Sequence, residues 1–120
     1  MRTDGKSVLK LRLLLGDLIA MGPGKADLLE AIRETGSISA AARRMGMDYR
    51  RAWALVEAMN QGFRKPLVEA APGGARGGGA QVTRMGEEVL EAFRRLQAKA
   101  EAAGAEELAF LRRRAAKPEG

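Results

Sequence analysis

The chain has 120 residues and a mass of 12.9 kDa, enough for one domain with a single modest core. Lys and Arg number 21 against 15 Asp and Glu, so the net charge is +6 and the pI about 10.3, a balance that favours anionic partners such as nucleic acid. The sequence contains no Cys and no His, which excludes disulfides, thiolate or imidazole catalysis and the usual zinc sites. We therefore expect no metal, no cofactor and no enzymatic activity.

The most apolar stretch lies near the N-terminus, where Lys10, Arg12 and Asp17 interrupt it. It is therefore neither a signal peptide nor a membrane span, which needs roughly 18 uninterrupted apolar residues. A cytoplasmic protein without a membrane partner is expected.

The first 36 residues predict a hairpin followed by a helix. Apolar and basic side chains alternate over residues 8–15, the period of a strand with one solvated face. Gly16 and Asp17 then allow a turn, so that residues 18–21 can return as a partner strand. A helix over residues 25–35 follows, with Gly36 as its stop and with apolar residues at helical spacing at Leu28, Leu29 and Ile32.

Residues 36–53, GSISAAARRMGMDYRRAW, predict two short helices joined by a tight turn. Ser37 is a good N-cap for the first, and Gly46 can adopt the left-handed conformation that ends it. Asp48 is expected to cap the next helix through its carboxylate. The core-facing residues expected are Ile38, Ala41, Ala42 and Met45 in one helix, and Ala52, Trp53, Val56, Met59 and Phe63 in the other.

After Pro66, two short apolar segments enclose a loop with five glycines between Gly73 and Gly79, which predicts a hairpin with a mobile tip. Thr83 is a plausible N-cap for a long helix that Gly104 weakens or bends, and the final residues form a basic tail. This helix carries an apolar stripe with heptad-like spacing at Met85, Val89, Phe93, Leu96 and Ala100.

This order of elements predicts a mainly α fold with small β hairpins: a winged helix-turn-helix with a long C-terminal helix for dimerisation. We expect a winged helix-turn-helix domain over residues 1–82, with the helix-turn-helix at about 37–62 and the wing at about 67–82. Residues 83–120 then form the dimerisation helix and tail. About 20 helical residues extend roughly 30 Å, so part of the stripe is expected to meet a second copy. A two-fold dimer would place its third helices about 34 Å apart, or a multiple of that, and select an inverted repeat.

The first turn of a recognition helix is the part that reaches base edges, and here it carries Tyr49, Arg50 and Arg51, with Ala54 one turn later. Arginine can bond bidentately to guanine, and tyrosine can reach a phosphate or a sugar. In the wing, backbone amides can approach phosphates while Arg76 enters or borders the minor groove. The candidate residues for binding double-stranded DNA are Ser37, Ser39, Asp48, Tyr49, Arg50, Arg51, Ala54, Arg76, Gly77 and Gly78.

Other interpretations stay open at this point. The arginines could be a solvated charged face, and the glycine-rich segment an ordinary loop. The helix over residues 83–111 could recruit a partner protein, which would make the chain a protein-interaction module. A nucleotide cradle is disfavoured, because no Gly-Lys-Ser or Gly-Lys-Thr occurs.

The segment GPGKADLLEAIRETGSISAAARRMGMDYRRAWALVEAMN, followed by LVEAAPGGARGGGAQVTRMG, resembles the N-terminal DNA-binding domain of the bacterial ModE-type molybdate-responsive transcriptional regulators. Their helix-turn-helix is related to that of LysR-type regulators. The resemblance spans nearly the whole chain and is most specific at residues 49–53, at Glu57, Met59 and Asn60, and in the wing. It implies a dimeric regulator with the third helix in the major groove. In that family a separate C-terminal domain senses molybdate; the sequence ends at Gly120 without one, so molybdate binding by this chain is not expected.

Overall fold

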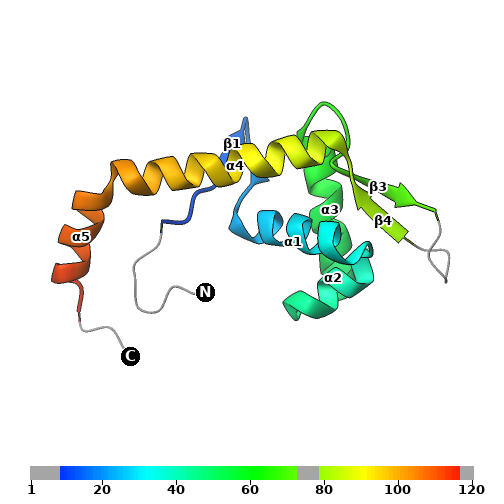
Figure 1. Ribbon diagram of the computed structural model, residues 1–120, viewed down its shortest axis with the longest axis horizontal. Coiled ribbons are helices and arrows are strands. Elements are labelled where there is room, and N and C mark those ends of the chain that lie inside the picture. The colour runs from blue at the N-terminus through cyan, green and yellow to red at the C-terminus, as the bar shows by residue number, and fades with distance from the viewer. Residues whose placement is uncertain (1–8, 73–78, 117–120) are drawn as a thin grey trace.

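The computed structural model describes residues 9–72 and 79–116 and extends over 52 × 32 × 22 Å. Figure 1 shows the first three helices gathered at one end, a hairpin beside them, and a long helix that runs away from them to a short last helix. The fold is mainly α with two small antiparallel hairpins, as the sequence predicts. The elements are β1 (Leu13–Leu15), β2 (Leu18–Met21), α1 (Pro23–Thr35), α2 (Ile38–Met45), α3 (Tyr49–Gly62), β3 (Val68–Ala71), β4 (Gly79–Val82), α4 (Arg84–Ala103) and α5 (Ala105–Arg114).

The first hairpin is shorter than the alternating pattern predicts, because β1 begins only at Leu13. Leu13 pairs with Met21, the last residue of β2, and Gly22 and Pro23 then begin α1. Among the described residues, no strand pairs with residues 9–12. This segment lies under α4 instead (Figure 1), and the backbone N–H of Leu9 donates to Glu101 Oε2 of α4 at 3.1 Å.

Helices α1, α2 and α3 enclose the core. Except at Trp53, the apolar periodicity of the sequence correctly predicts which faces are buried, and small alanine side chains let the backbones approach closely. Met21 of β2 and Leu67 before β3 close the core from the sides, both fully buried. The buried helix residues are Leu28, Leu29 and Ile32 in α1, Ile38, Ala41 and Ala42 in α2, and Ala52, Val56 and Met59 in α3.

The turn between α2 and α3 is held mostly by backbone groups. Gly46 has a φ of 67°, in the left-handed region, and its N–H donates to the carbonyl of Arg43 at 3.1 Å. Ser37 Oγ accepts from the N–H of Ala40 at 3.0 Å, which confirms the predicted N-cap of α2. The predicted carboxylate cap by Asp48 is wrong: its side chain makes no capping bond, and only its carbonyl takes part, accepting from Ala52 N–H at 3.0 Å.

The wing, β3 with β4, is fixed to the helical core at both strands. Val68 pairs with Val82 and Ala71 with Gly79. On the β4 side, the N–H of Ala80 donates to the carbonyl of Gly36 at the end of α1, at 3.0 Å. On the β3 side, the Asn60 side chain of α3 bonds the backbone at residues 67 and 68. The base of the wing is thereby tied to two helices, while its tip, residues 73–78, lies outside the described residues.

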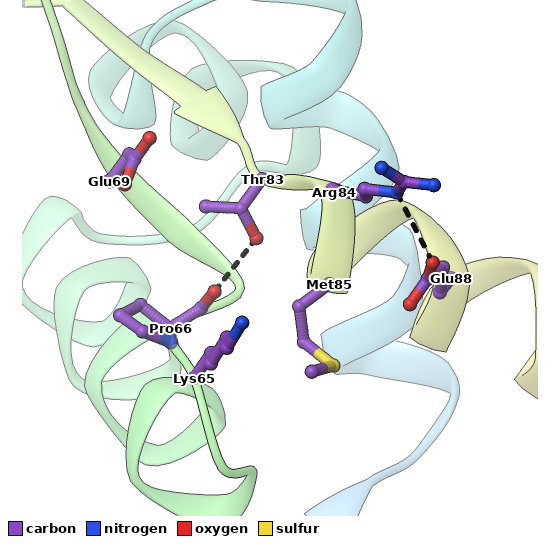
Figure 2. A pocket seen from close by; sticks show the side chains of 7 residues that line it. All are labelled: Lys65, Pro66, Glu69, Thr83, Arg84, Met85 and Glu88. Carbon is purple, nitrogen blue, oxygen red and sulfur yellow. Dashed lines mark hydrogen bonds and ion pairs between the residues drawn. The ribbon is translucent and has the colours of Figure 1, made fainter.

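The junction of the wing and α4 is tightly packed. Thr83 Oγ1 accepts from Gly86 N–H at 3.0 Å, which confirms the predicted N-cap, and donates to the carbonyl of Pro66 at 2.7 Å (Figure 2). Gly86 faces the neighbouring chain so closely that a Cβ there would lie 2.4 Å from the carbonyl oxygen of Leu67. The loop before β3 and the start of α4 therefore form one unit.

The first half of α4 packs on its own domain, which corrects part of the predicted dimer stripe. Phe93 is only 4% exposed and belongs to the core, with Leu90 beside it. Met85 and Val89 are partly buried against the same core. These side chains are used within the chain, since the first half of α4 packs against α1 and the core. Only Leu96, 49% exposed, and Ala100 remain from the stripe for a second copy.

Ion pairs reinforce this packing of α4 on α1. Arg94 reaches Asp27 at 2.9 Å and Glu30 at 2.6 Å, and Arg33 of α1 reaches Glu87 at 3.0 Å. Partial burial opposes the charged form of Arg94, but hydrogen bonds and the charges of Asp27 and Glu30 outweigh it, so the pKa of Arg94 is raised. The first half of α4 is therefore held firmly in place.

Helix α4 ends at Ala103, where Gly104 interrupts it as predicted, and α5 follows. Arg112 to Arg114, expected in the tail, belong to α5. The guanidinium of Arg114 lies 4.2 Å from the centre of the Phe110 ring, a cation–π contact that favours the helix. Phe110 and Leu111 are exposed on this helix.

Candidate nucleic-acid interface

The first turn of α3 is exposed, as predicted. Tyr49 is 49% exposed, and Arg50, Arg51 and Ala54 are also on the surface, whereas Ala52 is buried against the core. This arrangement follows from the helical period, since burying positions 52, 56 and 59 turns positions 50, 51 and 54 outward. The turn carries two positive charges and no acidic residue, so it can approach a polyanion.

Trp53 was predicted to face the core, and this is wrong: the indole is 41% exposed. Trp53 lies one helical turn after Tyr49, and its indole N–H donates to the Tyr49 hydroxyl. The two rings meet edge to face, with their centres 6.4 Å apart and their planes at 81°. Each ring restricts the other, so that an ordered aromatic pair stands beside Arg50 on the surface. The i, i+4 spacing of Tyr and Trp is the sequence signal for this pair.

The start of α2 adds further polar groups. The Ser37 hydroxyl is occupied by its capping bond, so its role in the structure is to begin the helix. Ser39 is exposed and accepts a bond from Arg43 Nη1 at 3.4 Å. Arg44 is paired with Glu34 of α1, which directs it away from the turn. Arg43, which was not among the predicted site residues, is thus a better candidate for an anion contact than Arg44.

Of the remaining predicted DNA contacts, the structure describes Asp48 but not the residues at the tip of the wing. Asp48 is exposed at the turn before α3. Arg76, Gly77 and Gly78 of the wing tip lie outside the described residues, so their expected contacts with DNA stay predictions. The base of the wing, β3 with β4, is tied to α1 and α3.

A hollow of about 470 Å³ lies at the base of the wing, where the loop before β3 meets the start of α4 (Figure 2). Its charged side chains have both signs, with Lys65 and Arg84 balanced by Glu69 and Glu88, and Arg84 is paired with Glu88 at 3.5 Å. This balance favours neither an anion nor a cation. Within residues 9–72 and 79–116, no cluster of three or more acidic side chains could hold a metal ion, and no helix is both long and apolar enough to cross a membrane.

Known proteins resemble the chain at both the sequence and the structural level. "Molybdenum-pterin-binding protein MopB" of Rhodobacter capsulatus is 50% identical over 78 residues, 65% of this chain and 29% of that protein. "DNA-binding transcriptional dual regulator ModE" of Escherichia coli (strain K12) is 39% identical over 83 residues, 69% of this chain and 32% of that protein. The chain thus spans about a third of the length of these relatives, and the predicted resemblance to ModE-type regulators is confirmed.

Among solved structures, the complex of the CbnR DNA-binding domain with DNA has a TM-score of 0.56 at 24% identity, covering 73% of this chain and 95% of that one. Full-length LysG of Corynebacterium glutamicum has a TM-score of 0.52 at 27% identity, covering 74% of this chain and 30% of that one. These similarities support the winged-helix fold. Residues 25–87, just over half of the chain, match the family described as "Bacterial regulatory helix-turn-helix protein, lysR family". The chain therefore belongs to the LysR family of bacterial regulatory helix-turn-helix proteins.

Proposed function

We propose that the chain is the sequence-specific, double-stranded-DNA-binding part of a transcriptional regulator. The observation that carries the proposal is the outward-facing first turn of α3, with Tyr49, Arg50 and Arg51 on a helix whose other face is locked into the core. Membership of the LysR family and the +6 charge support it. We also propose that the chain acts in the cytoplasm, as a regulator without catalytic activity.

In this proposal, α3 lies in the major groove. Arg50 donates to a guanine, a contact worth about 1–3 kcal/mol of discrimination against other bases. The ordered pair of Tyr49 and Trp53 presents flat apolar surface and a hydroxyl to the sugar and phosphate of one strand. Ala54, one turn further on, is small enough to face a thymine methyl group.

The elements around α3 position it on the duplex. Ser39 and Arg43 at α2 face the phosphates of one strand, and Ser37 and Asp48 border them. The wing, with Arg76, Gly77 and Gly78 at its tip, lies beside the next groove. We also propose that residues 1–82 bind DNA and that residues 83–120 serve dimerisation. The first half of α4 has a second role, since it packs on the DNA-binding unit. We continue to predict that this chain does not itself bind molybdate.

We further propose that two chains associate through the outer half of α4 together with α5. These elements carry Leu96, Phe110 and Leu111, all exposed, and they project from the domain (Figure 1). A two-fold dimer of this kind would space its α3 helices about 34 Å apart, or a multiple of that, and select an inverted repeat.

The test of DNA recognition uses a duplex selected from a random pool, with binding followed by fluorescence anisotropy. Arg50→Ala is expected to weaken binding to the selected duplex by about tenfold or more and to relax base preference at one position. Arg95→Ala is the matched control, because Arg95 is paired with Glu91 on α4, away from α3. An Arg50→Ala protein with unchanged affinity and base preference would refute the recognition-helix assignment.

A protein-interaction module is the second candidate function, and the exposed Phe110 and Leu111 on α5 favour it. In that case α5 and the end of α4 recruit a different protein and DNA contact is incidental. Competition with random-sequence duplexes distinguishes the two functions. If the chain is a protein-interaction module, random-sequence duplexes should displace the selected duplex as effectively as the selected duplex displaces itself.

A further inference from the structure

Helix α5 takes no part in the core of its own chain, since none of its ten residues is buried. Figure 1 shows it at the far end of α4, away from α1, α2 and α3. Its largest apolar side chains are also open to solvent, with Phe110 46% and Leu111 61% exposed. A helix shorter than about 12–15 residues is marginal in water without tertiary packing. Contact with a second surface would therefore stabilise α5.

One face of α5 combines apolar and charged side chains in a fixed order. Phe110 lies at its centre, four residues after Glu106 and four before Arg114, which is about one helical turn in each direction. The guanidinium of Arg114 lies 4.2 Å from the centre of the Phe110 ring, which places this cation on the same face. The helical period places Arg112 on the other side of the helix. The α5 face, as we name it, consists of Glu106, Glu107, Phe110, Leu111, Arg113 and Arg114.

The charges on the α5 face are separated by sign. The acidic side chains lie in the first turn of the helix and the basic ones in the last turn. This order suits the helix dipole, but the dipole does not require exposed apolar side chains between the two charged ends. A hollow of about 510 Å³ also lies on this face, where a side chain of another molecule can enter; its lining is Glu106, Glu107, Ala109, Phe110 and Arg113.

A surface with this pattern is complementary to itself. In a two-fold dimer both chains use the same surface, so each contact between two positions occurs twice. If two α5 helices lie antiparallel with the axis beside Phe110, the acidic end of each faces the basic end of the other, and the apolar side chains meet between them. A parallel arrangement would place like charges opposite each other. The order of charges therefore favours a second copy of this chain, in the antiparallel orientation.

We propose that α5 pairs antiparallel with α5 of a second copy, through the α5 face. This inference rests on the proposed function and deepens it, because it gives the dimer an orientation and a centre. The two-fold axis passes beside Phe110, at the end of the chain opposite the three-helix core (Figure 1). Glu106 and Glu107 of one copy then pair with Arg113 and Arg114 of the other.

The test reverses the charges at one end of α5 or at both and measures self-association by sedimentation equilibrium. Glu106→Lys with Glu107→Lys, and separately Arg113→Glu with Arg114→Glu, should each raise the dimer dissociation constant by about tenfold or more, because every altered pair occurs twice. Salt at about 0.5 M should weaken the unmodified dimer and strengthen the dimer of each double variant. Asp17→Lys with Glu57→Lys makes the same change of net charge at exposed positions outside α5 and is the matched control.

Restoring complementary charges should restore association. An equimolar mixture of the two double variants should form a mixed dimer, and the variant with all four reversals, which keeps the net charge of the unmodified protein, should self-associate again. Urea unfolding should change little in each variant, because α5 has no buried residue. If neither the mixture nor the four-residue variant recovers association, the antiparallel pairing is wrong.

Two other outcomes separate this inference from the proposed function. If both double variants associate like the unmodified protein while Leu96→Asp weakens association, the pairing of α5 is wrong and the proposed dimer stands. If the unmodified protein is monomeric, the inference and the proposed dimer both fail, and the α5 face is left for a different protein. The Arg50→Ala titration still decides DNA recognition in either case, since it does not depend on α5.

Discussion

Replacing Asn60 with alanine tests how the wing is held against the recognition helix. The Asn60 side chain makes three hydrogen bonds with backbone that leads into β3: Nδ2 donates to the carbonyl of Val68 at 3.0 Å, and Oδ1 accepts from Leu67 N–H at 2.8 Å and from Val68 N–H at 3.1 Å. Leu67 and Val68 are buried, so water replaces these partners poorly. Asn60→Ala therefore leaves two donors and one acceptor of the backbone without their partner.

The expected cost follows from these three bonds. Each contributes about 1 kcal/mol net, and a buried donor without a partner costs about 1–3 kcal/mol. Partial access of water to Asn60 lowers the total, so we expect Asn60→Ala to reduce the free energy of unfolding by about 3 kcal/mol. For a chain of this size, that loss lowers the melting temperature by on the order of 10 °C.

Urea unfolding followed by circular dichroism measures this loss, with Gln61→Ala as the control because Gln61 is the exposed neighbour on the same helix. Asn60→Asp is expected to be intermediate, since a carboxylate still accepts from both N–H groups but cannot donate to Val68. The reasoning is refuted if Asn60→Ala unfolds within about 0.5 kcal/mol of Gln61→Ala, because surface substitutions usually remain within that margin.

Four further substitutions have definite expected outcomes. Gly86→Ala would place a Cβ 2.4 Å from the carbonyl oxygen of Leu67 and 2.6 Å from Val82 Cγ1. Urea unfolding should therefore show that the free energy of unfolding falls by about 1–3 kcal/mol. Gly24→Ala serves as the control, because no atom lies within 4 Å of the Cβ added there. Phe93→Ala should lower the free energy of unfolding by about 3–5 kcal/mol, because the ring is buried in the core. Leu96→Asp, by contrast, should leave stability nearly unchanged and weaken self-association in sedimentation. A dimer unaffected by Leu96→Asp would contradict the proposed interface. Trp53→Phe removes the bond to the Tyr49 hydroxyl and should weaken DNA binding in anisotropy titrations without a change in melting temperature; equal affinity would exclude the aromatic pair from the interface.

Periodicity and helix caps were enough to predict the helices around the core. Helices α1 and α2 begin or end at Gly22, Gly36, Gly46 and Ser37, whose local chemistry does not depend on the rest of the fold, whereas the predicted Asp48 side-chain cap of α3 is not made. Apolar spacing likewise predicted the buried faces of these helices, because burial follows the helical period directly. The exposed turn of the candidate site follows from the same period.

Most of the errors originate in neighbours that are distant in the sequence. Phe93 lies on an apolar stripe that is equally suited to a second copy or to the same chain, and only the packing of α4 against α1 decides between them. Trp53 is large and apolar, yet its hydrogen bond to Tyr49 keeps it on the surface. The apolar pattern gives no signal for the structural role of Asn60, since its partners are backbone groups at the start of β3, later in the chain.

The structure connects the candidate DNA interface mechanically to the outer half of α4. Thr83 and Gly86 fix the start of α4 to the wing, and Arg94 fixes its middle to α1. The orientation of α3 relative to the first three turns of α4 is therefore set within a single chain. Beyond Arg94, the N–H of Leu9 still bonds Glu101, but the helix ends at Gly104. If two chains associate through Leu96 and α5, the spacing of their α3 helices is set by the rigid part of α4, and any adjustment is concentrated at Gly104.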